Sequence, residues 1–356
     1  MNYLFSNRAV SLLSTIVVRH NRRNSPSFKA NSQTCSTTRG YRDIPRMKAT
    51  TDELDLDTFR QDFWIPELPL ALYSFHSFPA ARKWFTHESQ SSQVSFAEHM
   101  EDHGNAILSY EYMSSVAPNG ATLDPQLKNL QDFQEWLQTS NQKERHHLPR
   151  IIDYLIQSGK DDRPRFQQFD APLSLLIRAC QFNHTRSNPS DRIQKLYVAQ
   201  SNLDHLPEAL SQDLPAPRLI NDAGKGDIYD SSIWLGLEPT YTPLHRDPNP
   251  NLFCQVLGSK IIHLIRPKLG SDLFVHVRRK LGYMGSSRFR GTEMMEGPER
   301  ELLHHAVWTD ESHSENIERV SVGPGDALFI PKGWWHSVAS TGDKAELNVS
   351  VNWWFR

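Results

Sequence analysis

Two hydrophobic patterns follow each other along the chain, and the change falls near residue 193. Before it, apolar residues recur at helical spacing, most clearly from Leu148 to Ile156, where they lie three or four residues apart. Such stripes are typical of helices that pack against a core and need no functional role. The same pattern predicts helices over 52–63, 79–85 and 125–137, and a strand over 106–112.

After residue 193, short apolar runs alternate with turns such as Gly258-Ser259. The predicted strands are 196–200, 228–237, 252–257, 260–265, 319–322, 327–330 and 347–355. Many short strands with tight turns predict a mainly β fold, a sandwich or jelly-roll barrel with the earlier helices on its flanks. A polar segment rich in Arg and Gly, at about 267–315, is expected to be an insertion between barrel strands.

Residues 1–46 have a third composition, with eight Arg or Lys residues, abundant Ser, and Asp43 as their one acid. This amphipathic, acid-poor composition is typical of a mitochondrial transit peptide, and Arg39-Gly40-Tyr41 resembles a processing site. A disordered basic tail is the alternative, as is translation from Met47, which would leave the protein in the cytoplasm or nucleus. The predicted organisation is therefore a leader (1–46), a helical shell (47–192) and a barrel (193–356).

Composition excludes several classes of protein. The net charge of −2 lacks the basic surplus of a dedicated nucleic-acid binder. Three cysteines (Cys35, Cys180 and Cys254) without paired spacing argue against a disulfide framework or a Cys-rich zinc module. No apolar run approaches the length that spans a membrane, so no membrane partner is expected.

The candidate chemistry lies in a His-x-Asp pair and a distant histidine. Residues two apart on a strand point the same way, so His245 and Asp247 can reach one metal together. His336 follows an apolar strand and a turn, which can deliver a third ligand at a barrel edge. Two histidines and one carboxylate leave open positions on an octahedral ion, as in the facial triad of non-haem Fe(II) oxygenases.

Three segments carry a family resemblance: TPLHRDPNPNLFCQVLGSK (242–260), GDALFIPKGWWHSV (325–338) and SVNWWF (350–355). Together they resemble the JmjC family, in particular its compact cupin-like hydroxylases similar to factor inhibiting hypoxia-inducible factor. The resemblance is strong over about 190–356. It implies a double-stranded β-helix (cupin) barrel that binds Fe(II), with 2-oxoglutarate as co-substrate and O2 as oxidant.

The resemblance also implies roles for further residues. Lys260 and Thr242 match positions that hold the distal carboxylate of 2-oxoglutarate, and Tyr197 matches a tyrosine that contacts it. Asn251 and Asn352 match positions near the metal and co-substrate. Arg246 departs from the aromatic residue common in relatives, and it is expected to point away from the metal.

Several functions are compatible with these residues. Hydroxylation of a protein side chain is the first expectation, because the chain lacks recognisable chromatin-reader modules and zinc clusters. Hydroxylation of a tRNA base and lysine demethylation are alternatives within the family, so an RNA partner stays open. A cupin that serves only as a binding or scaffold module is an alternative from another class. The sequence leaves the oligomeric state open.

Overall fold

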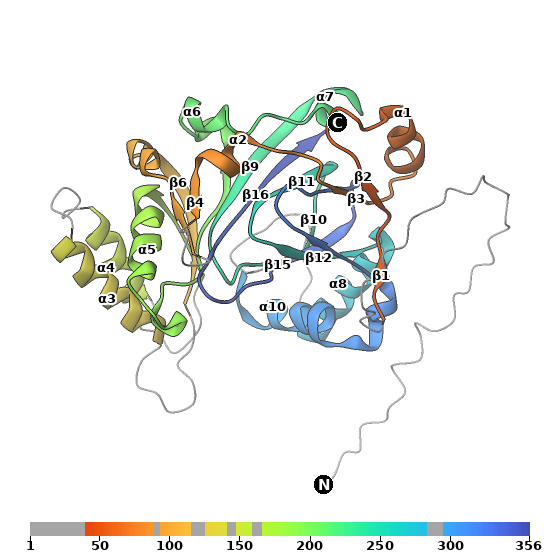
Figure 1. Ribbon diagram of the computed structural model, residues 1–356. Helices are drawn as coiled ribbons and strands as arrows, with labels where there is room; N and C mark the ends of the chain where they lie inside the picture. Colours follow the sequence, from red (N-terminus) through yellow and green to blue (C-terminus); the bar gives the residue numbers. More distant parts are fainter. Residues whose placement is uncertain (1–39, 88–92, 115–124, 141–146, 159–165, 283–294) are drawn as a thin grey trace, which may run out of the picture. The chain divides into compact units, whose positions relative to one another are not determined.

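The computed structural model describes residues 40–87, 93–114, 125–140, 147–158, 166–282 and 295–356. Most strands belong to two sheets that pack face to face (Figure 1). The smaller sheet has the order β1 (Arg42–Asp43), β13 (Ile317–Val322), β12 (Lys260–Ile265), β15 (Trp335–Ser340) and β10 (Tyr241–Arg246). The larger has the order β2 (Arg46–Lys48), β3 (Leu70–Tyr73), β14 (Ala327–Ile330), β11 (Asn251–Leu257), β16 (Leu347–Phe355), β9 (Ile228–Leu237), β8 (Leu196–Asn202), β6 (Ile107–Met113) and β7 (Phe166–Pro172).

The space between the two sheets is apolar over much of its length. Ile262, Val320 and Val338 from the smaller sheet meet Phe253 and Leu328 from the larger one, and all five are buried. Burial of this layer is the main force that closes the sheets on each other. The predicted double-stranded β-helix with flanking helices is therefore confirmed.

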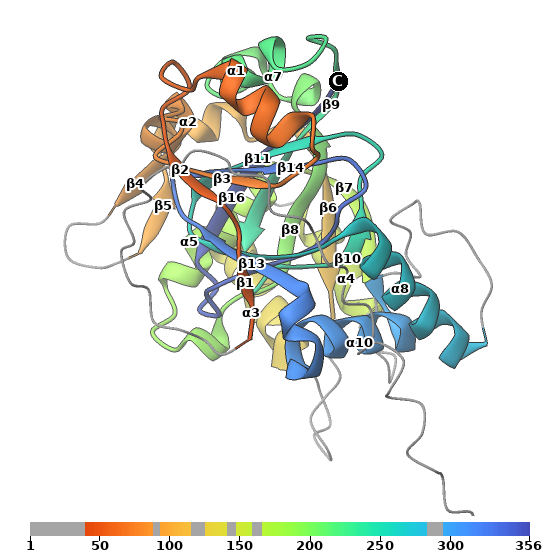
Figure 2. The same ribbon diagram turned by 90° about the vertical axis from the view of Figure 1, so that its right-hand side faces the viewer.

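Helices cover the outer face of the larger sheet (Figures 1 and 2). The predicted helices are present as α2 (Pro79–Lys83), α3 (Pro125–Ser140) and α4 (Leu148–Ser158), whereas the one predicted from residue 52 begins only at Leu56, as α1 (Leu56–Phe59) and the π-helical turn η1 (Arg60–Trp64). Among the described residues no helix is both long enough and apolar enough to cross a membrane. The remaining elements on this side are β4 (Phe85–His87), β5 (Val94–Phe96), η2 (Glu98–His103), α5 (Ser174–His184), η3 (Pro189–Asp191), η4 (Leu203–His205), α6 (Glu208–Ser211) and α7 (Arg218–Asp222).

The predicted insertion lies between β12 and β13, and its described residues are largely helical. Phe274, Leu303 and Val307 pack against Leu244 and Trp335 on the outer face of the smaller sheet. The insertion therefore covers that sheet. Its elements are α8 (Pro267–Leu281), α10 (Gly297–His304), η5 (His305–Thr309) and η6 (Glu311–Asn316).

The fold begins by Gly40, six residues before the predicted end of the leader at residue 46. β1 pairs with β13 in one sheet, and β2 pairs with β3 in the other. Ile44 between them is 2% exposed and belongs to the barrel core. The amphipathic pattern that predicts a transit peptide falls mainly in residues 1–39, which lie outside the described residues.

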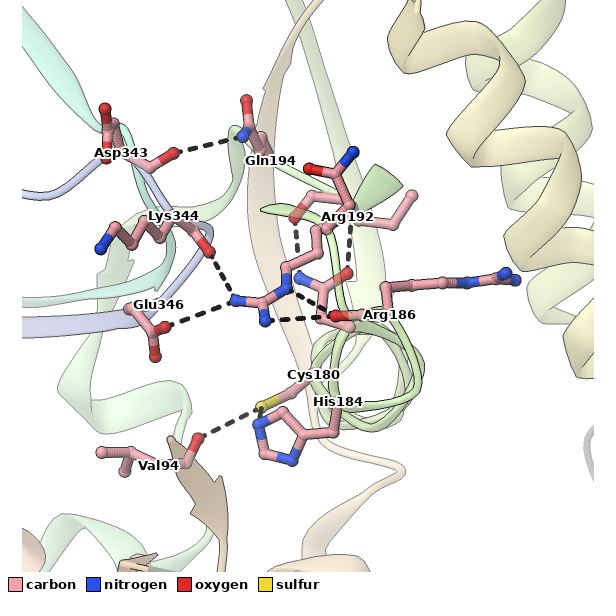
Figure 3. Close-up of polar contacts among 12 residues, drawn as sticks. Val94, Cys180, His184, Arg186, Arg192, Gln194, Asp343, Lys344 and Glu346 are labelled. Atoms are coloured by element: carbon pink, nitrogen blue, oxygen red, sulfur yellow. Dashed lines mark hydrogen bonds and ion pairs between the residues drawn. The ribbon is translucent and has the colours of Figure 1, made fainter. Parts of the chain in front are cut away.

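A buried arginine joins the helical shell to the barrel (Figure 3). Arg192 donates through Nε and Nη2 to the backbone oxygen of Arg186, both at 3.2 Å. Its Nη1 donates to the backbone oxygen of Lys344 at 3.0 Å and lies 3.5 Å from Glu346 Oε1. Because these bonds satisfy a cation that is only 7% exposed, they tie the segment before β16 to the segment that leads into β8.

Candidate metal centre

The candidate site is built where β10 and β15 lie side by side as antiparallel neighbours. Thr242 pairs with Val338 and His245 pairs with His336, so three steps along β10 oppose two steps along β15. This bulge brings Thr242 and His245 onto one face, whereas an uninterrupted strand would direct them to opposite faces. Pro243 sits inside the bulge, which β10 tolerates as the edge strand of its sheet.

The bulge and the strand pairing bring the three predicted metal ligands together. His245, Asp247 and His336 each offer a ligand atom, and these atoms lie within 4.8 Å of one another. Asp247 Oδ1 is 3.9 Å from His245 Nε2, and its Oδ2 is 3.6 Å from His336 Nε2. Within the part of the chain that the structure describes, this is the one cluster of three or more such groups. The three atoms can therefore occupy one face of a single metal ion.

The two histidines are oriented in the same way. Nδ1 of His245 lies 2.9 Å from the backbone oxygen of Pro243, and Nδ1 of His336 lies 3.2 Å from that of Trp334. If each Nδ1 carries the proton, it donates to its carbonyl, and the lone pair of Nε2 faces Asp247. Such second hydrogen bonds fix the tautomer and the ring orientation of metal-binding histidines.

The carboxylate of Asp247 is oriented by two predicted asparagines. Nδ2 of Asn251 donates to Asp247 Oδ2 at 2.9 Å, and Nδ2 of Asn352 donates to Asn251 Oδ1 at 2.8 Å. Burial opposes ionisation of Asp247, but the positive charge that His336 and His245 carry when protonated, together with hydrogen bonds such as that from Asn251, holds the pKa of the carboxyl below its usual value. Asp247 is therefore an anion at neutral pH, as a metal ligand requires.

Lys260 lies deeper in the barrel, on the same face as His336. It pairs with Ser340, which is four residues beyond His336 on β15, or roughly 13 Å of strand. The residue is 2% exposed, and its Nζ donates to Tyr197 Oη at 2.9 Å and to Ser350 Oγ at 2.8 Å. Both of these partners are neutral hydroxyl groups, and a buried ammonium group suits an anionic ligand.

A network of polar side chains, which the sequence analysis did not single out, extends the lysine pocket. Nδ2 of Asn348 donates to Glu238 Oε1 at 2.8 Å, and Nε2 of Gln255 donates to Asn348 Oδ1 at 3.0 Å. Burial raises the pKa of Glu238, although the hydrogen bond from Asn348 and the charge of Lys260 act in the opposite direction. The signal for this network was the alternation of Asn348, Ser350 and Asn352 on one predicted strand.

The space between the ligands and Lys260 has unused hydrogen-bonding capacity. The side-chain oxygen of Asn352 and the hydroxyl of Ser232 are buried, and neither has a hydrogen-bond partner among the described residues. The two residues are directly paired on β16 and β9, so they share a face. Buried polar groups without partners are rare in folded proteins, and a bound polar molecule would satisfy them. The residues present thus fit an Fe(II) ion and an anionic co-substrate.

Arg246 and a small aromatic cluster flank the candidate site. Arg246 lies over the ring of Trp335, 5.5 Å from its centroid, and Trp335 packs under the insertion. Arg246 therefore points away from the candidate ligands, as predicted. Tyr197, Trp234 and Trp354 form a small aromatic cluster between β8, β9 and β16, and Trp234 was not singled out from the sequence.

Comparison with known proteins agrees with this description of a cupin barrel carrying two histidines and an aspartate. The model of the cupin-like domain family matches residues 59–356, and the chain belongs to that family. It groups with the JmjC proteins, a family of Fe(II)- and 2-oxoglutarate-dependent oxygenases.

Individual relatives are similar to the chain over part of their length. JmjC domain-containing protein D of Dictyostelium discoideum is 32% identical over 40% of this chain and 32% of its own length. Lysine-specific demethylase 8 of Danio rerio is 33% identical over 45% of this chain and 36% of its own length. Lysine-specific demethylase JMJ30 of Arabidopsis thaliana is 23% identical over 85% of this chain and 53% of its own length. The chain thus aligns with about a third to a half of these relatives. The expected likeness to factor inhibiting hypoxia-inducible factor stays a prediction.

Proposed function

We propose that the protein is a dioxygenase that uses Fe(II) and 2-oxoglutarate to hydroxylate a side chain of another protein. The balanced reaction converts a C–H bond, O2 and 2-oxoglutarate into C–OH, succinate and CO2. The observation that carries the proposal is the placement of His245, Asp247 and His336 on one face, with buried Lys260 further along the same face. A metal site alone would need no such cation.

Each residue has a distinct task in this proposal. The Nε2 atoms of His245 and His336 and the carboxylate of Asp247 hold the iron, which supplies the activation of O2 and leaves three positions for exogenous ligands. Lys260 binds the distal carboxylate of 2-oxoglutarate with a charge-assisted hydrogen bond, and Tyr197 and Ser350 hold its ammonium in place. Thr242 pairs with Val338, which lies on β15 between His336 and the partner of Lys260, and it adds a hydroxyl donor.

Lysine demethylation is the second candidate function. The names of two relatives, lysine-specific demethylase 8 and lysine-specific demethylase JMJ30, favour it. The two candidates share the metal centre, because hydroxylation of an N-methyl group gives a product that loses formaldehyde. Mass spectrometry of peptides after turnover separates them: a stable gain of oxygen supports the hydroxylase, and loss of a methyl group with release of formaldehyde supports the demethylase.

The experiment that tests the common proposal is anaerobic binding of Fe(II) and 2-oxoglutarate, followed by the visible charge-transfer band of the complex. Wild type is expected to show the band, His245→Ala to lose it, and Lys260→Ala to need more 2-oxoglutarate to reach it. Lys344→Glu, an exposed position, serves as the control. A wild-type protein that binds neither molecule would overturn the proposal and favour a non-catalytic binding module.

A further inference from the structure

Exposed apolar side chains gather where β9 begins and β16 ends. Ile65 is 72% exposed, Tyr229 63% and Ile228 44%. Ile228 pairs with Phe355, so the start of β9 lies beside the end of β16. Figures 1 and 2 both place α1 and α7 at this end of the larger sheet. Large apolar side chains that cluster on a surface often mark an interaction site.

A groove of about 480 Å³ lies at this position, and cations form its rim. Trp64, Ile65, Ala223 and Pro250 supply its apolar lining, and the cations are Arg60, Lys225, Lys332 and Arg356. Arg60 is engaged, since it donates to Asp57 at 2.7 Å and to backbone oxygens. The other three cations form no ion pair with any described acidic side chain, and no Asp or Glu lines the groove. The main-chain carboxyl group of Arg356 also lies there and accepts the N–H of Lys225 at 2.6 Å, so Lys225 and Lys332 carry the net positive charge of the groove.

The groove is continuous with the loop that carries Asp247 and with the loop that leads into β15 and its ligand His336. Pro250 lines it and is three residues from Asp247, so their Cα atoms are at most about 11 Å apart. Lys332 lines it four residues before His336, and the neighbouring Gly333 donates its N–H to the backbone oxygen of Asp247 at 3.3 Å. A chain bound in the groove would therefore lie within a few residues' reach of the metal centre.

We propose that this groove docks an acidic segment of the protein substrate, with an apolar side chain of that segment seated against Trp64 and Ile65. The inference rests on the proposed function for the identity of the partner. Charge complementarity selects the occupant, since the free cations on the rim attract carboxylates and the lining buries an apolar group. It disfavours the chain's own residues 1–39, which contain six Arg or Lys residues and no acid.

Direct binding tests the proposal without relying on turnover. The probe is a short fluorescein-labelled peptide in which glutamates flank two leucines, and its binding to the full chain is followed by fluorescence anisotropy. Reversing both rim charges, Lys225→Glu with Lys332→Glu, is expected to weaken binding about tenfold or more, and Ile65→Ser about fivefold. Lys344→Glu, at the opposite end of β16, is the matched control and is expected to change binding less than about twofold.

Other results would overturn the docking proposal. Equal binding by wild type and the Lys225→Glu, Lys332→Glu variant would do so, as would no binding of the peptide to wild type. A single-stranded RNA of equal charge that binds more tightly than the peptide, with no effect of Ile65→Ser, would identify a nucleic-acid surface instead. Circular dichroism melts show whether each variant folds. The Fe(II) and 2-oxoglutarate band of the same variants reports separately on the proposed function, because these residues bind neither molecule.

Discussion

The two faces of β16 are both buried, but they differ in almost every chemical property. Val349, Val351 and Phe355 on one face are fully buried in the large apolar core under the helices. Asn348, Ser350 and Asn352 on the other face are just as deeply buried, yet they are polar and hydrogen-bonded to Glu238, Lys260 and Asn251. One strand therefore separates the part of the protein that stabilises the fold from the part that would bind ligands.

This contrast shows what alternation means in a doubly covered strand. On a strand with one solvated face, alternation separates core from water. In β16, where no residue is exposed, the polar face needs another explanation, because burying amides and hydroxyls costs free energy unless they find partners. A polar ligand between the sheets is that explanation, and substitutions on the two faces should have different consequences.

The largest expected effect is on the metal centre itself. His336→Ala and Asp247→Ala should each lower Fe(II)-dependent turnover of 2-oxoglutarate by about a thousandfold or more, because two ligands leave the ion weakly held. Turnover assays with graded Fe(II) measure this loss. The unfolding midpoint of the metal-free protein should change little, and a large drop would mean that these residues act mainly in folding.

Substitutions on the core face of β16 should lower the stability of the protein and leave its binding of Fe(II) unchanged. Trp353→Ala is expected to lower the free energy of unfolding by about 3–5 kcal/mol, since the side chain is 2% exposed and its removal leaves a cavity. Urea titration measures the loss. At a temperature where the variant is folded, its affinity for Fe(II) should match that of wild type, and a matching loss of affinity would contradict the separation of the two faces.

Lys260 should affect the co-substrate more than the metal. Lys260→Met keeps the length of the side chain but removes its charge, so the KM for 2-oxoglutarate should rise about thirtyfold or more. Fe(II) binding without co-substrate should be nearly unchanged. Equal losses for both would indicate that the substitution disturbs the whole barrel.

His76, a buried histidine outside the metal centre, should make the stability of the protein depend on pH. Burial lowers the pKa of His76 to about 4, from 6.5 when unfolded. Below pH 6.5 the unfolded chain binds the proton and the folded one does not, so stability falls as the pH drops towards 4. By pH 5 the loss should be about 2 kcal/mol. His76→Phe should remove this part of the pH dependence in urea titrations, and an unchanged profile would show that other groups cause it.

The smallest expected effect concerns Asn352, which reaches the metal only through Asn251. Asn352→Ala should weaken Fe(II) binding about tenfold, because the carboxylate of Asp247 loses the support of its hydrogen-bonded chain. Competition with a chelator measures the change. Asn352→Ser, which restores a donor, should recover part of the loss, whereas wild-type affinity in Asn352→Ala would exclude an orienting role.

Periodicity predicted most of the larger elements, including α3, α4, β9, β12 and β16, because their patterns follow from burial of one or both faces. It missed α5, whose residues from Ser174 to Phe182 are buried apart from Arg178 and Gln181, so that its polar stripe is narrow. It also predicted one helix over 52–63, where the structure has two short helical elements, α1 and η1.

The candidate ligands were found from the His-x-Asp spacing and the resemblance, whereas their geometry was not predictable. The bulge around Pro243 depends on the pairing of β10 with β15, which local sequence does not specify. The partners Tyr197 and Ser350 of Lys260 likewise come from two strands that are distant in the chain, β8 and β16. The insertion was recognised by its polarity, but its apolar helical face at Phe274 and Val277 was overlooked.

The position of β16 also has a consequence for how the protein acquires its structure. This strand is the last along the described chain, yet it lies in the interior of the nine-stranded sheet, between β11 and β9. β1 and β3, near the start of the fold, likewise pair with β13 and β14, which are synthesised much later. Such long-range pairing makes folding slow and leaves strand edges unpaired until late. A nascent chain would expose these edges during synthesis, so chaperone dependence should be greatest just before β16 becomes available.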